Sequence, residues 1–437
     1  MRITGVHDEY SSVPADRRLG MNQDMQTRRR QLVSGLGDSG GALWIVLDQV
    51  ASRASVGIKF LLVAIWLGPD AIGTASLALI VLQVVECLTE TGLVQAYVQS
   101  KETISRQTAA AIWWTQLGRG GLVSVALAAL AIPLGNFFGL QDASAVIFLT
   151  VPVPLLRNAY SLGLSQAYKD CDFRSLAAIN VMGAIVDLIA TAVACQNGMG
   201  AMSIIVGNLL CEAFKFVASW ARFPMKQWLH PDWRSTRHLN RYGRWIWIHS
   251  VMNLFCNQYD KLVIAKLLGA GALGNMQMAS KASQLIYMDV ANTAAHFIFP
   301  KLSAKNREST ASATSYFQRV YRQLTWTFLL VTPVAAFAAI TIGYRLAEAW
   351  QPAAAVFLLL IPGQFLSAVN AVLSAHLRAL GRPKKVFQSA AAQALIMVLV
   401  TTPLCFQFGL KGAILGNTLA ALAAFVTMRW QLRGART

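Results

Sequence analysis

Charged side chains are scarce in this 437-residue chain. Only 13% of its residues are Asp, Glu, Lys or Arg, whereas soluble globular domains carry about 25%. At the same time 55% of the residues are hydrophobic, and the mean hydropathy is +0.46. A soluble enzyme needs more charge to cover its water-facing surface, and a disordered chain has few apolar runs. The composition therefore excludes both classes and predicts that most of the chain lies in lipid.

Motifs for metal binding and for covalent catalysis are also missing. The six cysteines lie far apart without a CxxC or Cys/His cluster, so neither a metal site nor a disulfide framework is predicted. Gly37-Asp-Ser-Gly-Gly41 resembles a chymotrypsin-like protease motif, but a helical membrane chain lacks the double β-barrel that this chemistry needs. No Walker A motif occurs, which argues against an autonomous ATPase. We expect a protein that is not an enzyme and that binds no cofactor and no metal ion.

Long apolar runs begin at Leu43 and alternate with short polar breaks. A helix needs about 20 apolar residues to cross the hydrocarbon core, and by that measure the chain holds about twelve spans. The expected spans are 43–67, 71–98, 108–136, 144–167, 175–195, 199–221, 244–267, 271–299, 320–343, 353–376, 385–407 and 410–430. The ten-residue alternation of membrane β-strands is absent. We therefore expect an all-α integral membrane protein.

Cations concentrate on one side of the expected membrane. If the N-terminus is cytoplasmic, 28 of the 38 Lys and Arg residues lie in the termini and loops of that side. Cytoplasmic loops collect Lys and Arg, so this distribution predicts an even number of spans with both termini cytoplasmic. The formal net charge of +18 then reflects the orientation of the chain in the membrane, and no nucleic-acid partner is expected.

The expected division of the chain follows from the spans and the longest polar break. It comprises a cytoplasmic N-terminal tail at 1–40, a first lobe of six helices at 41–221, a basic cytoplasmic linker at 222–243, and a second lobe of six helices at 244–437 that ends in a short cytoplasmic segment.

The two expected lobes resemble each other in sequence. Residues 60–78 align with residues 261–279 at an offset of 201, with seven identities in nineteen positions. The identities include two glycine pairs, Gly68 with Gly269 and Gly73 with Gly274. An even number of helices in each repeat gives both the same orientation, with an axis along the membrane normal. Two such lobes that face a cavity form a transporter architecture.

Seven cations and seven acids fall inside the expected spans. A charge in the bilayer core costs about 2.5–3.5 kcal/mol on insertion scales, so these side chains should face a cavity or a partner. The cations that suit a large anion are Arg53, Arg119, Arg157, Lys261 and Lys281. The acids that would balance them, or bind a coupling ion or proton, are Glu86, Glu90, Asp260 and Asp289.

A purely structural role is the alternative for each of these charges. Glu212 and Lys215 illustrate it, because they lie three positions apart on one expected helix and are able to pair with each other.

Three segments resemble polysaccharide transporters of the multidrug/oligosaccharidyl-lipid/polysaccharide exporter superfamily. They are Leu67-Gly-Pro-Asp-Ala-Ile-Gly73 with the following Glu90-Thr-Gly-Leu-Val-Gln-Ala-Tyr97, then Tyr259-Asp-Lys-Leu-Val-Ile264 with Leu268-Gly-Ala-Gly-Ala-Leu-Gly274, and Phe299-Pro-Lys-Leu-Ser303. The resemblance covers most of residues 43–430 and implies the two-lobed fold of multidrug and toxin exporters (MATE-like).

The resemblance also implies a function. It is that of an inner-membrane flippase that moves undecaprenyl-pyrophosphate-linked oligosaccharides from the cytoplasmic to the periplasmic leaflet by alternating access, for O-antigen, capsule or exopolysaccharide synthesis. The pyrophosphate would meet the cations named above. A polysaccharide polymerase and a chain-length regulator are implied partners, and the chain is expected to act as a monomer in the bilayer.

Other functions stay open at this point. A cation-coupled drug exporter of the same superfamily would have a net acidic cavity, whereas the charges inside the spans are balanced here. A membrane glycosyltransferase or polymerase usually places acidic catalytic residues in large external loops, and every expected external loop is short. A lipid II flippase is a further alternative that the motifs favour less.

Overall fold

The computed structural model consists of helices joined by short turns in the residues that it describes, without a strand among them. These residues are 39–99, 105–140, 142–170, 172–224, 231–233, 237–295, 298, 302, 310–345, 348–380 and 382–433. Most of the expected tail at 1–40 lies outside the described residues. The same is true of positions 225–230 and 234–236 in the expected linker, and of the motif at 299–303 apart from Leu302.

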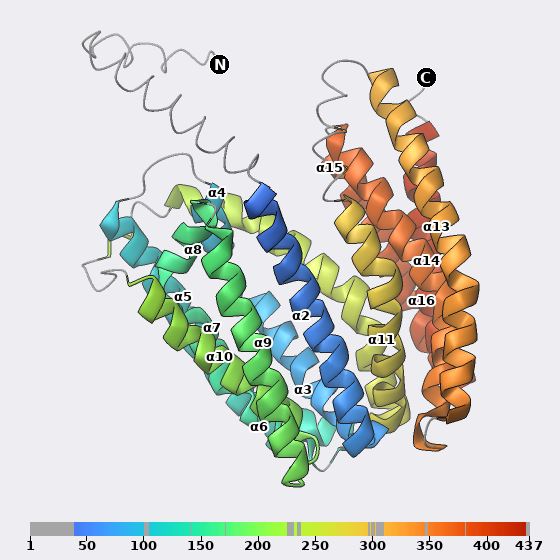
Figure 1. Ribbon diagram of the computed structural model, residues 1–437, viewed down its shortest axis with the longest axis horizontal. Coiled ribbons are helices and arrows are strands. Elements are labelled where there is room, and N and C mark those ends of the chain that lie inside the picture. The colour runs from blue at the N-terminus through green and yellow to red at the C-terminus, as the bar shows by residue number, and fades with distance from the viewer. Residues whose placement is uncertain are drawn as a thin grey trace.

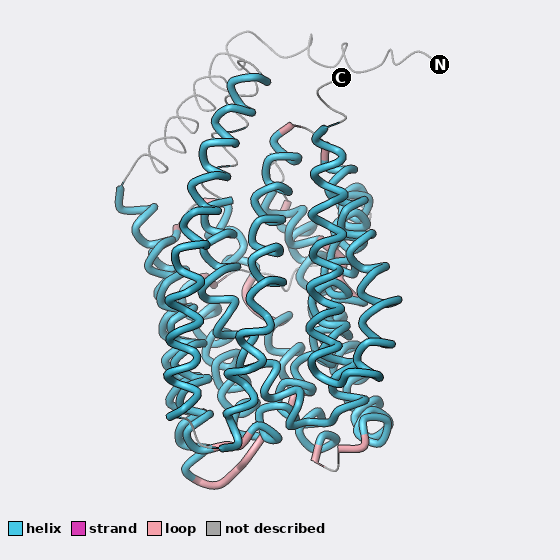
Figure 2. Tube along the Cα trace, turned by 90° about the vertical axis from the view of Figure 1, so that its right-hand side faces the viewer, coloured by secondary structure: helices cyan, strands magenta, loops and turns pink. Residues whose placement is uncertain are grey.

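The helices form two groups (Figure 1), and most of them run roughly parallel or antiparallel to one another (Figure 2). The first group comprises α2 (Ser39–Trp66), α3 (Pro69–Leu88), α4 (Leu93–Gln99), α5 (Arg106–Phe138), α6 (Ala143–Leu149), α7 (Pro152–Asn158), α8 (Leu162–Lys169), α9 (Phe173–Gln196) and α10 (Met202–Arg222). The second comprises α11 (Arg237–Ser283), the π-helix η1 (Gln284–Met288), α13 (Thr310–Arg345), the 3-10 helix η2 (Glu348–Trp350), α14 (Gln351–Ala379), α15 (Pro383–Ile396), the π-helix η3 (Met397–Thr401) and α16 (Thr402–Arg433).

Two of the long elements each contain a pair of helices that meet at a glycine. Gly269 divides α11 and has a φ of 83°, and Gly409 divides α16 and has a φ of 60°. A side chain with a Cβ rarely adopts this left-handed region, so glycine is needed at both turns. Both positions fall in the breaks that the sequence predicts, at 267–271 and at 407–410.

The described residues contain nine helices that are long and apolar enough to cross a membrane. The number is ten if Ala143–Asn158 and Leu162–Lys169, which are bent by 57°, form one span. The fourth expected span is therefore broken, with Pro152 at the start of one piece and Ser161 capping the next. The second expected span ends earlier than predicted, because α3 stops at Leu88 and α4 begins after Gly92, which has a φ of 65°. An all-helical multi-pass membrane protein is confirmed, and the count of twelve spans stays a prediction.

The two groups pack most closely where α3 meets α11, just after the turn between α2 and α3. A Cβ on Gly73 would lie 1.8 Å from the carbonyl oxygen of Ala270, and a Cβ on Gly274 would lie 1.9 Å from that of Pro69. The two contacts exchange places under the 201-residue offset, as expected of repeats related by a two-fold axis. The largest hydrophobic core continues across this contact and includes Ile72 and Leu273, both 0% exposed. The repeated glycines thus join the two groups at one end of the molecule.

Candidate binding site between the two helix groups

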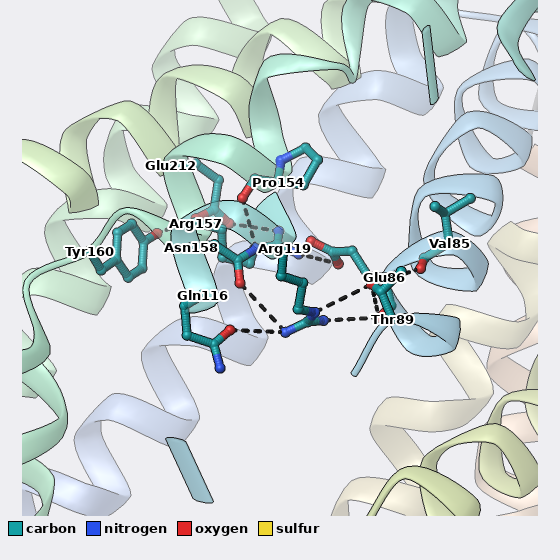
Figure 3. Close-up of polar contacts among 10 residues, drawn as sticks. All are labelled: Val85, Glu86, Thr89, Gln116, Arg119, Pro154, Arg157, Asn158, Tyr160 and Glu212. Atoms are coloured by element: carbon teal, nitrogen blue, oxygen red, sulfur yellow. Dashed lines mark hydrogen bonds and ion pairs between the residues drawn. The ribbon is translucent and has the colours of Figure 1, made fainter. Parts of the chain in front are cut away.

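Arg157 lies at the centre of an ionic cluster in the first helix group (Figure 3). Its Nη1 atom is 2.8 Å from Oε2 of Glu86 on α3, and its Nη2 atom is 2.8 Å from Oε1 of Glu212 on α10. Tyr160 donates a hydrogen bond to the other oxygen of Glu212. The arginine therefore connects three helices, and its positive charge is shared between two carboxylates.

Arg119 of α5 lies beside this cluster but has only neutral partners (Figure 3). Its guanidinium donates to the carbonyl oxygen of Glu86 at 2.9 Å and to the side chains of Thr89 and Gln116 at 3.3 Å each. A fourth contact reaches Oδ1 of Asn158 at 3.5 Å. None of the described carboxylates lies within 4 Å of this guanidinium, so its charge is available to an anion in the cavity.

A glycine brings the two arginines close to each other. A Cβ on Gly120 would lie 2.9 Å from the carbonyl oxygen of Pro154 and from the side chain of Asn158. Only a residue without a side chain therefore allows α5 and α7 to approach this closely. The neighbouring residue Arg119 and the last turn of α7, which carries Arg157, are placed side by side as a result.

A cavity of about 590 Å³ lies between this cluster and α11. Its charged lining residues are Glu86, Glu90, Arg119 and Arg157, and α11 contributes Asn253 and Asn257. Oε1 of Glu86 is buried and accepts no hydrogen bond from the described residues. This volume lies in the range of small-molecule sites. The cavity combines two arginines with one incompletely bonded carboxylate.

A second cavity of the same size lies within the second helix group and shares Asn253 and Asn257 of α11 with the first. Its charged lining residues are Lys261, Asp289 and Arg378. Lys261 is 3.3 Å from Oδ1 of the preceding Asp260, whose Oδ2 accepts a hydrogen bond from Asn417 at 2.9 Å. The two cavities therefore adjoin along α11, and the structure separates the predicted cations between them.

Arg53 and Asp289 join the two helix groups. Nη1 of Arg53 on α2 is 3.2 Å from Oδ1 of Asp289 and also 3.2 Å from its carbonyl oxygen. Both side chains are partly exposed, at 31% and 27%. The sequence predicts Arg53 in an anion site and Asp289 among the acids that balance it. In the structure the two side chains pair directly with each other.

A double-mutant cycle measures this contact. We expect Arg53→Gln and Asp289→Asn each to weaken it by about 0.5–1 kcal/mol, because exposed ion pairs contribute little. The double variant should be no less stable than the less stable of the two single variants, since either substitution alone removes the ion pair. Thermal unfolding of the purified proteins gives the coupling free energy between the two side chains. Glu348→Gln, at an exposed position, is the control. Additive losses would show that the two side chains do not interact.

Other charges in the spans are distributed differently from the predictions. Lys281 is not among the residues that line either cavity and makes no ion pair with the described acids, but the charges of Lys261 and Asp289 in the second cavity act on it, so its assignment to the anion site stays a prediction. Glu212 and Lys215 do not pair, because Glu212 faces α7 while the Lys215 side chain lies against Gly183 of α9. Lys59 forms an ion pair with Asp187, in which Nζ lies 2.6 Å from Oδ1. No group of three potential metal ligands is present in the described part of the chain.

Sequence reasoning missed the neutral side chains of the two cavities. Gln116 and Asn158 hold Arg119, and further amides line both cavities. Amides inside apolar spans are a signal that could have identified them, because an unpaired polar group is costly in lipid.

The chain is similar in sequence to proteins of polysaccharide biosynthesis. A family model described as polysaccharide biosynthesis protein matches residues 62–355. The lipopolysaccharide biosynthesis protein WzxC of Escherichia coli (strain K12) is 23% identical over 278 residues, which are 62% of this chain and 55% of the relative. An uncharacterized membrane protein in the cps region of Klebsiella pneumoniae is 18% identical over 289 residues, which are 64% of this chain and 58% of the relative. The matches thus span little more than half the length of each relative.

Solved transporter structures share the fold. Lipid II flippase MurJ, in an inward closed conformation, matches 89% of this chain and 87% of its own with a TM-score of 0.71 and 13% identity. A multidrug resistance MATE family transporter, in an inward-facing conformation, matches 91% of this chain and 99% of its own with a TM-score of 0.66 and 13% identity. The exporter fold that the sequence motifs imply is confirmed.

Proposed function

The chain belongs to the polysaccharide biosynthesis protein family, and we propose that it is a flippase for undecaprenyl-pyrophosphate-linked oligosaccharides in the bacterial inner membrane. It moves the repeat units of an O-antigen, capsule or exopolysaccharide from the cytoplasmic to the periplasmic leaflet. Both termini lie in the cytoplasm, and the chain works as a monomer. A polysaccharide polymerase and a chain-length regulator act on the translocated product.

The observation that carries this proposal is the pair of arginines in the first cavity. Arg119 has no carboxylate partner among the described residues, and Arg157 beside it carries two. A guanidinium binds phosphate oxygens in a bidentate manner, and the pyrophosphate of the lipid provides several such oxygens. Arg119 therefore makes the first contact with the pyrophosphate, and Arg157 joins it when Glu86 moves away.

Glu86 is the acid that responds to the substrate. Its Oε1 atom has no hydrogen bond to the described residues, so only the contact of Oε2 with Arg157 holds the carboxylate in place. A bound pyrophosphate competes with Glu86 for Arg157, and the released carboxylate takes up a proton or a cation from the cavity. Glu90 at the same cavity and Asp260 in the second group are further candidates for this coupling role.

Alternating access follows from the way in which the two groups meet. The reciprocal glycine contacts close the end at which α2 passes into α3, and Arg53 bonded to Asp289 adds a weaker connection. Opening this end separates α3 from α11 and exposes the cavities to the opposite side of the membrane. The substrate crosses without covalent chemistry.

A deletion strain tests the function. We expect the strain to accumulate undecaprenyl-pyrophosphate-linked repeat units on the cytoplasmic side and to lose its surface polysaccharide. Extraction and mass spectrometry of the lipid-linked units measure the first effect, and staining of surface polysaccharide measures the second. The unaltered gene supplied on a plasmid is the control. Normal surface polysaccharide in the deletion strain, with no second transporter in the genome, would refute the proposal.

A further inference from the structure

Half of the residues that line the second cavity have neutral hydrogen-bonding side chains. Among its 22 lining residues are eight Asn and Gln side chains and three serines, against three charged residues. Each amide offers two donor hydrogens and an acceptor oxygen, so this wall both donates and accepts. Phe387, which is 42% exposed, adds an aromatic surface. The first cavity also has six amide side chains, but four of its 14 lining residues are charged and two of these are arginines.

Several of these amides do not serve the fold. The side chains of Gln284, Asn292, Gln364 and Gln393 make no hydrogen bond to other described residues, although all four line the cavity. Asn370 is 8% exposed and uses its amide nitrogen to bond the carbonyl of Ala421, yet its Oδ1 atom has no partner in the described structure. Polar groups inside a membrane lobe are costly unless something satisfies them.

Two of the three charges of this cavity are neutralised within the protein, while the exposed Arg378 makes no ion pair with the described acids and donates to the carbonyl oxygen of Ser374 at 3.3 Å. Lys261 is held by Asp260, and Asp289 is held by Arg53. The amides between these charges suit neutral groups of a ligand, and a phosphate finds two neighbouring arginines, Arg119 and Arg157, in the first cavity. Hydroxyl and N-acetyl groups of a sugar match amides in both donor and acceptor capacity.

We propose that the second cavity is a glycan subsite that binds the sugar residues of the lipid-linked oligosaccharide. This inference rests on the proposed flippase function. The pyrophosphate lies at Arg119 and Arg157, and the sugars extend past Asn253 and Asn257, which line both cavities. The flippase thereby distinguishes a glycosylated lipid from the bare carrier.

Two ligands separate the two subsites. The first is undecaprenyl pyrophosphate, and the second is the lipid-linked oligosaccharide extracted from the deletion strain. Binding to the full-length purified protein is measured for both in the same detergent. We expect the unaltered protein to bind the oligosaccharide lipid at least tenfold more tightly, because only this ligand reaches the amides. This comparison needs no variant.

Substitutions then assign the difference in affinity to the amides. Removing one neutral hydrogen bond weakens binding about fivefold, so Gln364→Leu/Gln393→Leu should weaken the binding of the oligosaccharide lipid about 25-fold. The same variant should bind undecaprenyl pyrophosphate within twofold of the unaltered protein, which also shows that it is folded. Arg119→Gln should weaken the binding of both ligands. Gln318→Leu, at an exposed position of α13 outside the cavity, is the matched control.

Each outcome decides one of the two proposals. If the unaltered protein binds neither lipid, the flippase function fails and the subsite fails with it. If it binds undecaprenyl pyrophosphate as tightly as the oligosaccharide lipid, the function stands and the glycan subsite is overturned. If Gln364→Leu/Gln393→Leu loses affinity equally for both ligands, or for neither, the glycan subsite is overturned as well.

Discussion

Arg157→Met is expected to reduce transport about a hundredfold. The substitution leaves Glu86 and Glu212 without their shared cation, and the side chains of these two acids are only 16% and 10% exposed. Removing one member of a buried ion pair costs about 3–5 kcal/mol, and the 38% exposure of Arg157 argues for the lower end of this range. The variant also loses one of the two arginines proposed to bind pyrophosphate. Recovery of surface polysaccharide in the deletion strain measures the effect.

A triple variant separates the structural part of this effect from the functional part. Arg157→Met/Glu86→Gln/Glu212→Gln removes the cation together with both carboxylates, so the cluster carries no uncompensated charge. We expect its thermal stability to return toward that of the unaltered protein while transport stays low. Arg106→Met, at an exposed position where α5 begins, is the control and should transport normally. Full transport by the triple variant would show that Arg157 serves only the fold.

Gly73→Leu and Gly274→Leu are expected to prevent closure where the two helix groups meet. The added Cβ would lie 1.8 Å from the carbonyl oxygen of Ala270 in the first variant and 1.9 Å from that of Pro69 in the second. Both obstacles are main-chain atoms, so α3 and α11 must move apart. Overpacking typically costs about 1–3 kcal/mol, which shifts an equilibrium between closed and open states about 5- to 150-fold. The repeat symmetry predicts similar effects for the two variants.

Thermal unfolding and transport together test this contact. We expect each leucine variant to unfold about 5 °C below the unaltered protein, in keeping with an overpacking cost of this size. Transport should fall at least about fivefold, since a closed end is one of the two states that alternating access requires. Gly68→Ala lies in the same turn but has no atom within 4 Å of the added Cβ, so it should behave like the unaltered protein. A leucine variant with normal stability and transport would exclude a role for this contact.

Much of the fold could be predicted from the sequence because the lipid environment imposes simple rules. Apolar runs of about 20 residues predict membrane helices, and the glycine breaks near 269 and 409 fall where the structure places left-handed turns. The bend in the fourth span and the early end of α3 were missed, since both depend on local turns at Ser161 and Gly92. Hydropathy does not distinguish such a turn from a continuous apolar helix.

The candidate site could be predicted only in its composition. The high cost of charge in lipid identifies Arg119, Arg157 and Glu86 as residues that need partners or water. Which partner each one has depends on helices that are far apart in sequence. Arg157 meets Glu212, 55 positions away, while the nearby Lys215 turns toward α9. The spacing of two residues along one helix gave the wrong partner here, because contacts between helices outweigh it.

The sequence by itself determined the membrane class, the helical fold, the related glycine motifs of the two halves and the set of costly charges. Composition and periodicity are sufficient for these, because each follows from the transfer of side chains and backbone into lipid. Only the tertiary structure decided that Arg119 keeps a charge without a carboxylate partner in the described residues, and that Arg53 bonds Asp289 across the groups. It also decided that eight amides from the second helix group line one cavity together. These features depend on which helix faces pack together, and that arrangement reflects side-chain volumes and distances that no local pattern records.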